Sequence, residues 1–147
     1  MTLFREGREE DVPAIVALLA DDRLGAAREA PGDPAYLAAF HEIAADPSQA
    51  QYVAERDGRV VGCLQLSVIP GLGMRGARRG MIEAVRVASD LRGQGVGAEF
   101  VRFAVEQARA RGCRLVQLTS DLSRDDAHRF YERLGFARSH AGFKLTL

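Results

Sequence analysis

The chain has 147 residues, enough to bury one hydrophobic core, and we expect a single domain over residues 1–147. Its 20 basic and 20 acidic residues cancel, which argues against nucleic acid and anionic membranes as general partners. No apolar run approaches the ~20 residues of a membrane span, and the N-terminus shows no signal-peptide pattern, so we expect a cytoplasmic location. Cys63 and Cys113 form no Cys-x-x-Cys motif and fit free thiols in a reducing compartment.

The first half of the chain predicts a strand, two helices and a hairpin. Apolar residues at helical spacing follow the first strand, and Asp33 before Pro34 is typical of a second helix start. The dipeptide Asp57-Gly58 between two apolar runs favours a tight hairpin turn. The predicted ranges are a strand at 3–6, a helix at 9–19, a loop at 21–33, a helix at 34–45, and strands at 50–55 and 60–69.

The second half alternates strands and helices after a glycine-rich connection. Its predicted ranges are a loop at 70–80, a strand at 81–88, a helix at 98–111, a strand at 115–119, a helix at 125–134 and a last strand at 136–147. The unit from 81 to 119 should be a right-handed crossover between parallel strands. The element order βααβββαβαβ therefore predicts an α/β fold with a mixed, partly parallel central sheet flanked by about four helices.

The most informative motif is Arg92-Gly93-Gln94-Gly95-Val96-Gly97, which lies between the predicted strand at 81–88 and the helix at 98–111. At such a turn, free backbone N–H groups and the positive end of the helix dipole converge. Glycines let the backbone approach a phosphate without a Cβ in the way. The motif indicates a ligand that carries phosphate groups.

Two other phosphate-binding motifs fit less well. A Walker loop needs Gly-Lys-Ser or Gly-Lys-Thr, and here Ala98-Glu99 follows the last glycine. The dinucleotide fingerprint is formally present, but residues 89–92 separate the strand from the first glycine, and no acid ends the next strand at the required distance. A nucleotide-binding oxidoreductase domain is therefore only a distant third hypothesis for the function. The structural alternative is a glycine-rich loop that binds no ligand.

The chain resembles the GNAT superfamily of N-acetyltransferases. Residues 92–97 match the family motif Arg/Gln-x-x-Gly-x-Gly/Ala, and residues 130–136, Phe-Tyr-Glu-Arg-Leu-Gly-Phe, match a second motif near the C-terminus. The resemblance implies acetyl-CoA as donor, with its pyrophosphate on the amides of Arg92, Gly93, Gln94, Gly95, Val96 and Gly97. It also implies that Val85 and Val87 offer strand backbone groups to the pantetheine arm. Many members carry Asn where this chain has Arg124, so a side-chain contact to the cofactor is missing or a charged contact to phosphate replaces it.

Two residues are candidates for proton transfer. An amine acceptor must lose a proton before it attacks the thioester, and Glu83, which interrupts an apolar strand, is the candidate base. In some family members the base lies where this chain has Met81, and Glu83 could instead lie on a solvated face or pair with an arginine such as Arg86. By resemblance, Tyr131 protonates the leaving thiolate; its alternative role is core packing. We expect no metal site, because the three histidines lack ligand spacing.

The sequence thus predicts an acetyl-CoA-dependent N-acetyltransferase that acetylates a primary amine of a small molecule or peptide directly, without a covalent intermediate. The alternative is a non-catalytic acyl-CoA-binding module. We expect the acceptor side to be formed by residues 21–33, by the helix with Tyr36 and Phe40, and by the loop 70–80, with Asp21, Asp22 and Glu29 able to attract a cation. A small amine is favoured over a protein, and a homodimer is one option for the oligomeric state.

Overall fold

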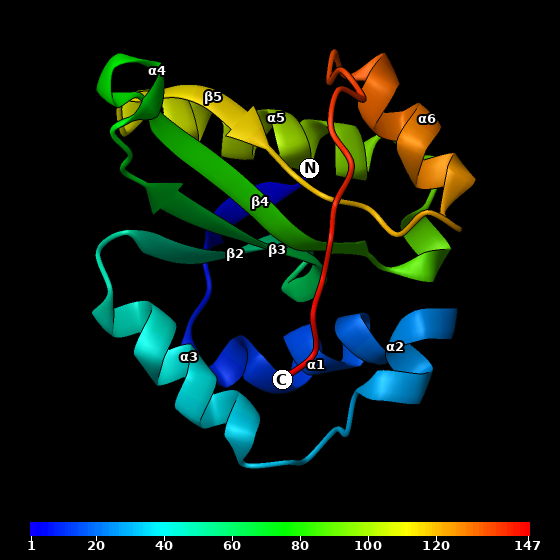
Figure 1. Ribbon diagram of the computed structural model, residues 1–147. Helices are drawn as coiled ribbons and strands as arrows, with labels where there is room; N and C mark the ends of the chain where they lie inside the picture. Colours follow the sequence, from blue (N-terminus) through cyan, green and yellow to red (C-terminus); the bar gives the residue numbers. More distant parts are fainter.

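The computed structural model describes residues 1–147 and contains one five-stranded sheet with helices on both faces (Figure 1). The strands follow chain order across the sheet, β1-β2-β3-β4-β5; β1 to β4 are antiparallel neighbours, and β5 runs parallel to β4. Their bounds are Leu3–Glu6, Gln49–Arg56, Arg59–Ile69, Arg78–Val87 and Cys113–Gln117. The predicted mixed α/β fold and the parallel crossover are confirmed.

Six α-helices surround the sheet, with α1, α2 and α3 on one face and α5 on the other (Figure 1). Their bounds are α1 Val12–Ala20, α2 Arg23–Arg28, α3 Ala35–Ala45, α4 Gly73–Gly76, α5 Val96–Ala110 and α6 Asp125–Arg133. Single 3-10 turns at Glu9–Asp11 and Ser89–Leu91 precede α1 and α5. None of these helices combines the length and apolar character needed to cross a bilayer.

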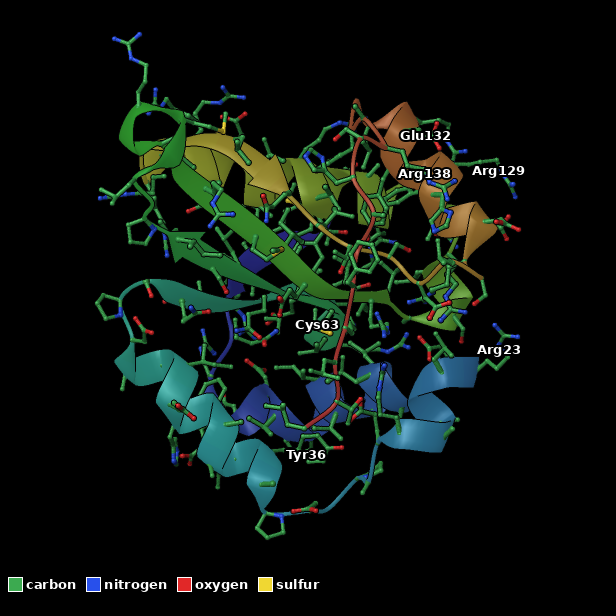
Figure 2. The ribbon with its side chains drawn as sticks, in the orientation of Figure 1. Arg23, Tyr36, Cys63, Arg129, Glu132 and Arg138 are labelled. Carbon is green, nitrogen blue, oxygen red and sulfur yellow. The ribbon has the colours of Figure 1, made fainter.

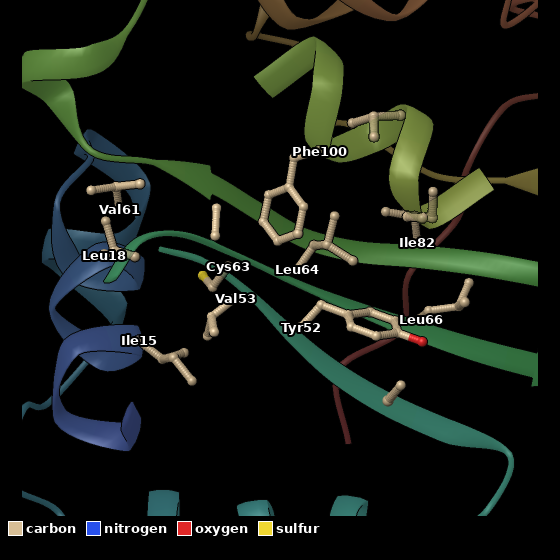
Figure 3. Packing of buried hydrophobic residues seen from close by; sticks show 14 of the residues in the cluster. Ile15, Leu18, Tyr52, Val53, Val61, Cys63, Leu64, Leu66, Ile82 and Phe100 are labelled. Carbon is tan, nitrogen blue, oxygen red and sulfur yellow. The ribbon is translucent and has the colours of Figure 1, made fainter. Parts of the chain in front are cut away.

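The hydrophobic core lies on both faces of the sheet (Figure 3). Phe100 of α5 is fully buried against the face that carries Leu64, and Ile15 of α1 packs toward the opposite face with Val53 and Cys63. Because helices cover both faces, the central strand β3 must be apolar on both sides, which explains its nearly continuous apolar run. This core holds β4, the strand that leads into the glycine motif, in place between the two helical layers.

A bulge at Ala84 breaks the alternation of β4. Ala84 has a positive φ of 54°, and the register with β3 shifts between the pairs Cys63↔Arg86 and Gln65↔Glu83. An extra residue in one strand lets two residues oppose one on the partner strand. Since Cys63 and Gln65 share a face of β3, Glu83 and Arg86 share the face toward α1 and α2, which regular alternation would have forbidden.

Three segments differ from the sequence prediction. The expected loop 21–33 contains α2, and the connection 70–80 contains α4 and the first residues of β4, so the structure has two short helices more than expected. The strand predicted at 136–147 is wrong: the chain after α6 forms no strand, and in the view of Figure 1 it passes in front of the sheet in the direction of α1. The predicted hairpin is confirmed, with Asp57 and Gly58 at φ 52° and 75°, as a tight turn of this kind requires.

Candidate active site

The site is built where β4 and β5 separate. Their pairing ends at Met81↔Gln117, whereas β4 continues to Val87. The Val85 carbonyl accepts a hydrogen bond from Arg86 Nη1 at 2.9 Å, and the Val87 carbonyl accepts one from Arg92 Nε at 3.3 Å. Because the pairing ends at Met81, the rest of β4 has no neighbouring strand on the β5 side. The side chains of Arg86 and Arg92 lie along this part of the strand.

The glycine motif follows directly and presents a row of unpaired amides. None of the backbone N–H groups from Gly93 to Ala98 donates to a protein acceptor, and the first that does is that of Glu99, to Gly95 O at 3.1 Å. Gly93 and Gly95 have φ of 78° and 84°, values that side chains with a Cβ rarely adopt. These amides stand at the N-terminus of α5, so the geometry is that of an anion site.

The polar side chains of the motif shape the loop from within. Arg92 Nη2 donates to Asp21 O at 3.3 Å, which ties the loop to the end of α1 in addition to the bond to Val87. Gln94 Nε2 donates to Asp90 O at 3.2 Å, and Val96 is buried in the core. The sequence-based prediction concerned the amides of these residues, and the side chains of Arg92 and Gln94 hold the backbone that carries those amides.

Gly97, in the first turn of α5, lies close to both α6 and β4. A Cβ placed there would lie 3.4 Å from Phe130 Cζ and 3.6 Å from Val87 Cγ2. A contact at 3.4 Å is at the lower limit of van der Waals contact, so any larger side chain would push α6 away. Gly97 therefore joins the two motifs noted in the sequence, because Phe130 belongs to the second.

Tyr131, next to Phe130 on α6, lies between two aromatic rings. Its ring is 5.1 Å from that of Phe130 and 5.8 Å from that of Phe136, both edge-on. Burial raises the pKa of the Tyr131 hydroxyl, and the nearby cations Arg124 and Arg86 only partly offset that effect. Tyr131 therefore stays protonated at neutral pH and can donate a proton.

Two arginines from distant parts of the chain share one carboxylate near Tyr131. Arg86 Nε and Arg124 Nη2 lie 3.0 Å and 3.2 Å from Asp22 Oδ2, while Asp22 Oδ1 accepts from Gly25 N and so caps α2. Burial acts to raise the pKa of Asp22, but the Gly25 bond and the two guanidinium groups hold it below its ordinary value. The Arg86 contact is a close ion pair that is poorly aligned as a hydrogen bond, since the Nε–H has no acceptor in good geometry.

This triad changes the interpretation of three predicted residues. Arg124, expected near the cofactor, uses its side chain to bind Asp22. Asp22, expected to attract a cationic acceptor, is already paired with two cations. Arg86 was considered as a partner for Glu83 but pairs with Asp22 instead, so Glu83 remains an exposed carboxylate on the face that Arg86 shares. A charged residue in an apolar strand is the one sequence feature that pointed toward the triad.

The other expected acceptor residues lie on α2 and α3. The hydroxyl of Tyr36 donates to Glu29 Oε1 at 2.9 Å and accepts from Ala30 N at 2.8 Å, so it fastens the connection to α3 (Figure 2 shows Tyr36). Phe40 instead lines a hollow of about 210 Å³ between α3 and β2, which also involves Arg111 and none of residues 92–97. Tyr36 and Phe40 therefore do not form a common wall there. No group of three metal-ligating side chains occurs in the structure.

Comparison with known proteins connects this geometry with one family. A profile described as the acetyltransferase (GNAT) family matches residues 13–136. An aminoalkylphosphonate N-acetyltransferase from Salmonella typhimurium is 36% identical over 102 residues, which are 69% of this chain and 66% of that protein, just under two thirds of its length.

Two solved structures match over the whole chain. A crystal structure described as a transcriptional regulator from Bacillus halodurans C-125 is 44% identical, with a TM-score of 0.97 over 100% of both chains. An acetyltransferase from Trypanosoma brucei is 27% identical, with a TM-score of 0.83 over 100% of both chains. Because the family profile covers most of the sequence, the chain belongs to the GNAT family of acetyl-transferring enzymes.

Proposed function

We propose that this protein is an acetyl-CoA-dependent N-acetyltransferase that acts directly on the primary amine of a small molecule or peptide. The observation that carries the proposal is the row of unpaired amides from Gly93 to Ala98, which follows the part of β4 that extends beyond its last pair with β5. The amides suit the pyrophosphate of CoA. The backbone at Val85 and Val87 suits the amide groups of pantetheine, which can pair with a strand as a peptide does.

In the proposed reaction, the neutral amine attacks the carbonyl carbon of the thioester. The N–C bond forms, the C–S bond breaks, and the sulfur leaves as a thiolate. Glu83 accepts the proton that the amine loses, directly or through water, and Tyr131 gives its proton to the thiolate. The exposure of Glu83 on the α1 and α2 face suits contact with an acceptor that enters from that side.

Direct transfer is supported by the lack of a suitable cysteine nucleophile. Cys63 is fully buried under the sheet (Figure 2), and burial raises the pKa of its thiol to about 12. Cys113 begins β5, at the end where β5 is paired with β4, and burial raises its pKa as well. Thiols of raised pKa are poor nucleophiles at neutral pH.

A small acceptor is supported by the Salmonella relative, whose name gives an aminoalkylphosphonate as its substrate. That molecule is a primary amine with an anionic group. The two guanidinium groups of Arg86 and Arg124 exceed the single charge of Asp22, so the surroundings of Tyr131 are compatible with an acceptor that carries a negative charge.

The test is thiol release from acetyl-CoA across a panel of small amines and basic peptides, with Tyr131→Phe as the variant. We expect turnover to fall by ~100-fold or more, with CoA affinity nearly unchanged, because only the proton donor is lost. Tyr52→Phe is the matched control, since that hydroxyl contacts Arg111 on α5's far end and not the site. CoA binding without turnover on any amine would instead favour a non-catalytic acyl-CoA-binding module.

A further inference from the structure

One end of the molecule carries an excess of positive charge, although the chain as a whole is neutral. Residues 68–82 and 107–120 contain no acidic residue. The parallel pairing of β4 with β5 places these two stretches side by side, beginning with the pair Arg78↔Cys113. The surface that they form, which we call the basic end, carries six arginines: Arg75, Arg78, Arg79, Arg109, Arg111 and Arg114.

Most of these arginines have no acidic partner. Arg109 and Arg111 each lie near a carboxylate, at 3.4 Å and 3.8 Å, and the other four form no ion pair. Arg78 Nη1 donates to Arg111 O at 2.9 Å, and Arg114 Nη2 donates to Met74 O at 2.7 Å. A backbone carbonyl does not neutralise a guanidinium group, so the basic end attracts anions.

The 70–80 connection exposes two apolar side chains beside these charges. Leu72 is 98% exposed and Met74 is 66% exposed. Met74 and Arg75, in the single turn α4, have φ of 53° and 61°, a region that non-glycine residues rarely occupy. Arg114 holds this turn through the carbonyl oxygens of both residues. A costly backbone conformation that leaves apolar side chains in solvent is consistent with a surface that contacts a partner.

The basic end and the glycine motif lie at opposite ends of β4. This strand starts at Arg78, ends just before the motif and spans ten residues. At the usual rise of a strand, about 30 Å separates its two ends. Figure 1 accordingly shows α4 on one side of the molecule and α2 and α6 on the other. A large partner at the basic end therefore leaves the candidate active site accessible.

We propose that the basic end binds the surface of an anionic lipid bilayer, with the arginines at the headgroup phosphates and with Leu72 and Met74 inserted below them. A bilayer surface suits both kinds of side chain, because guanidinium groups bind phosphate and apolar side chains leave water. A nucleic acid would suit the arginines alone, since its phosphate backbone offers no apolar environment. The attachment is peripheral and reversible, and it does not depend on acetyl transfer.

The first test is sedimentation of the full-length protein with vesicles of phosphatidylcholine, either alone or mixed with an equal part of phosphatidylglycerol. We expect binding to the anionic vesicles only, and weaker binding as salt is added. Arg75→Gln combined with Arg79→Gln should weaken binding about 25-fold, since each arginine near an anionic surface contributes roughly fivefold. Neither side chain forms a hydrogen bond or ion pair within the protein, so the fold should be kept.

The matched control for these charges is Arg28→Gln combined with Arg129→Gln. It removes two exposed arginines from α2 and α6, on the other side of the molecule, and should change vesicle binding little. Failure of the wild-type protein to bind anionic vesicles would overturn the proposal. An equal loss of binding in the control would also overturn it, because general charge rather than the basic end would then explain the attraction.

The second test separates a bilayer from a nucleic acid. Leu72→Ser combined with Met74→Ser should weaken binding to anionic vesicles about tenfold, because the two apolar side chains no longer leave water there. Unchanged vesicle affinity of this variant would refute the insertion. Duplex DNA at an equal concentration of phosphate should leave the wild-type protein on the vesicles. Release of the protein by the DNA would identify nucleic acid as the preferred partner and would refute the proposal.

Discussion

Asp22 connects the stability of the fold with the candidate site. It caps α2 through Gly25 N and pairs with Arg86 of β4 and Arg124 before α6. The side chains of Asp22 and Arg86 are 14% and 9% exposed, whereas that of Arg124 is 34% exposed. We predict that Asp22→Asn, which keeps the cap but removes the charge, destabilises the protein strongly.

The magnitude follows from these exposures. Removal of one partner from a buried ion pair lowers the free energy of unfolding by about 3–5 kcal/mol. Solvent weakens the interaction of the partly exposed Arg124 with Asp22, so we expect Asp22→Asn to lower the free energy of unfolding by about 3 kcal/mol. Asp22→Ala should cost about 1 kcal/mol more, because it also removes the cap. For a chain of this size, about 3 kcal/mol lowers Tm by roughly 6–12 °C.

The assay is urea unfolding followed by circular dichroism, at pH 7 and at lower pH. The pKa of Asp22 is lower in the folded than in the unfolded state. The charged Asp22 therefore stabilises the protein fully at a pH above the pKa of the unfolded state, about 3.9, and this stabilisation is lost as the pH falls through the pKa of the folded state. The difference between wild type and Asp22→Asn should therefore shrink in acid. Asp90→Asn, which breaks an exposed pair with Arg59, is the control and should change stability little. Equal stability of wild type and Asp22→Asn at pH 7 would refute the reasoning.

Three further predictions follow from the site and the core. Gly95→Val should weaken CoA binding sharply in calorimetry, whereas Gly32→Val, at a similar φ of 92° in a distant loop, should not. Equal CoA affinities of the two variants would show that these amides do not bind CoA. Glu83→Gln should reduce turnover most at low pH, where the amine is most protonated, and a pH–rate profile that overlays that of wild type would exclude Glu83 as the base. Asp11→Asn should lower the free energy of unfolding by about 2 kcal/mol, because it leaves Glu55 as the one carboxylate paired with the shielded Arg5. An unchanged midpoint of urea unfolding would contradict this.

Features fixed by neighbouring residues could be predicted from the sequence. The Asp57-Gly58 turn, the amphipathic α5 and the glycine motif depend on residues within a few positions of one another, and the structure has all three. The α2 helix escaped prediction because six residues are too few to show helical periodicity; its first turn is capped by the side chain of Asp22.

Features that depend on distant residues could not be predicted. The triad joins positions 22, 86 and 124, which only the folded chain brings together. The segment predicted as a strand at 136–147 has apolar alternation, but a strand also needs a partner, and this segment joins no strand of the sheet. Residue roles at the site, for Glu83, Tyr131 and the amide loop, remain predictions that the variants above address.

The bulge at Ala84 explains how β4 can present Glu83 toward the proposed acceptor and also pack against the glycine motif. In a regular strand, Glu83 and Arg86 would lie on opposite faces, because side chains alternate. The extra residue reverses the alternation once, so Arg86 follows Glu83 onto the face of α1 and α2, while Val87 turns toward Gly97 and α5. The same strand thus presents a carboxylate to the proposed acceptor side and packs against the loop that we propose for the pyrophosphate. A positive φ at a non-glycine residue is costly, and its presence here is consistent with a conformation retained for the site.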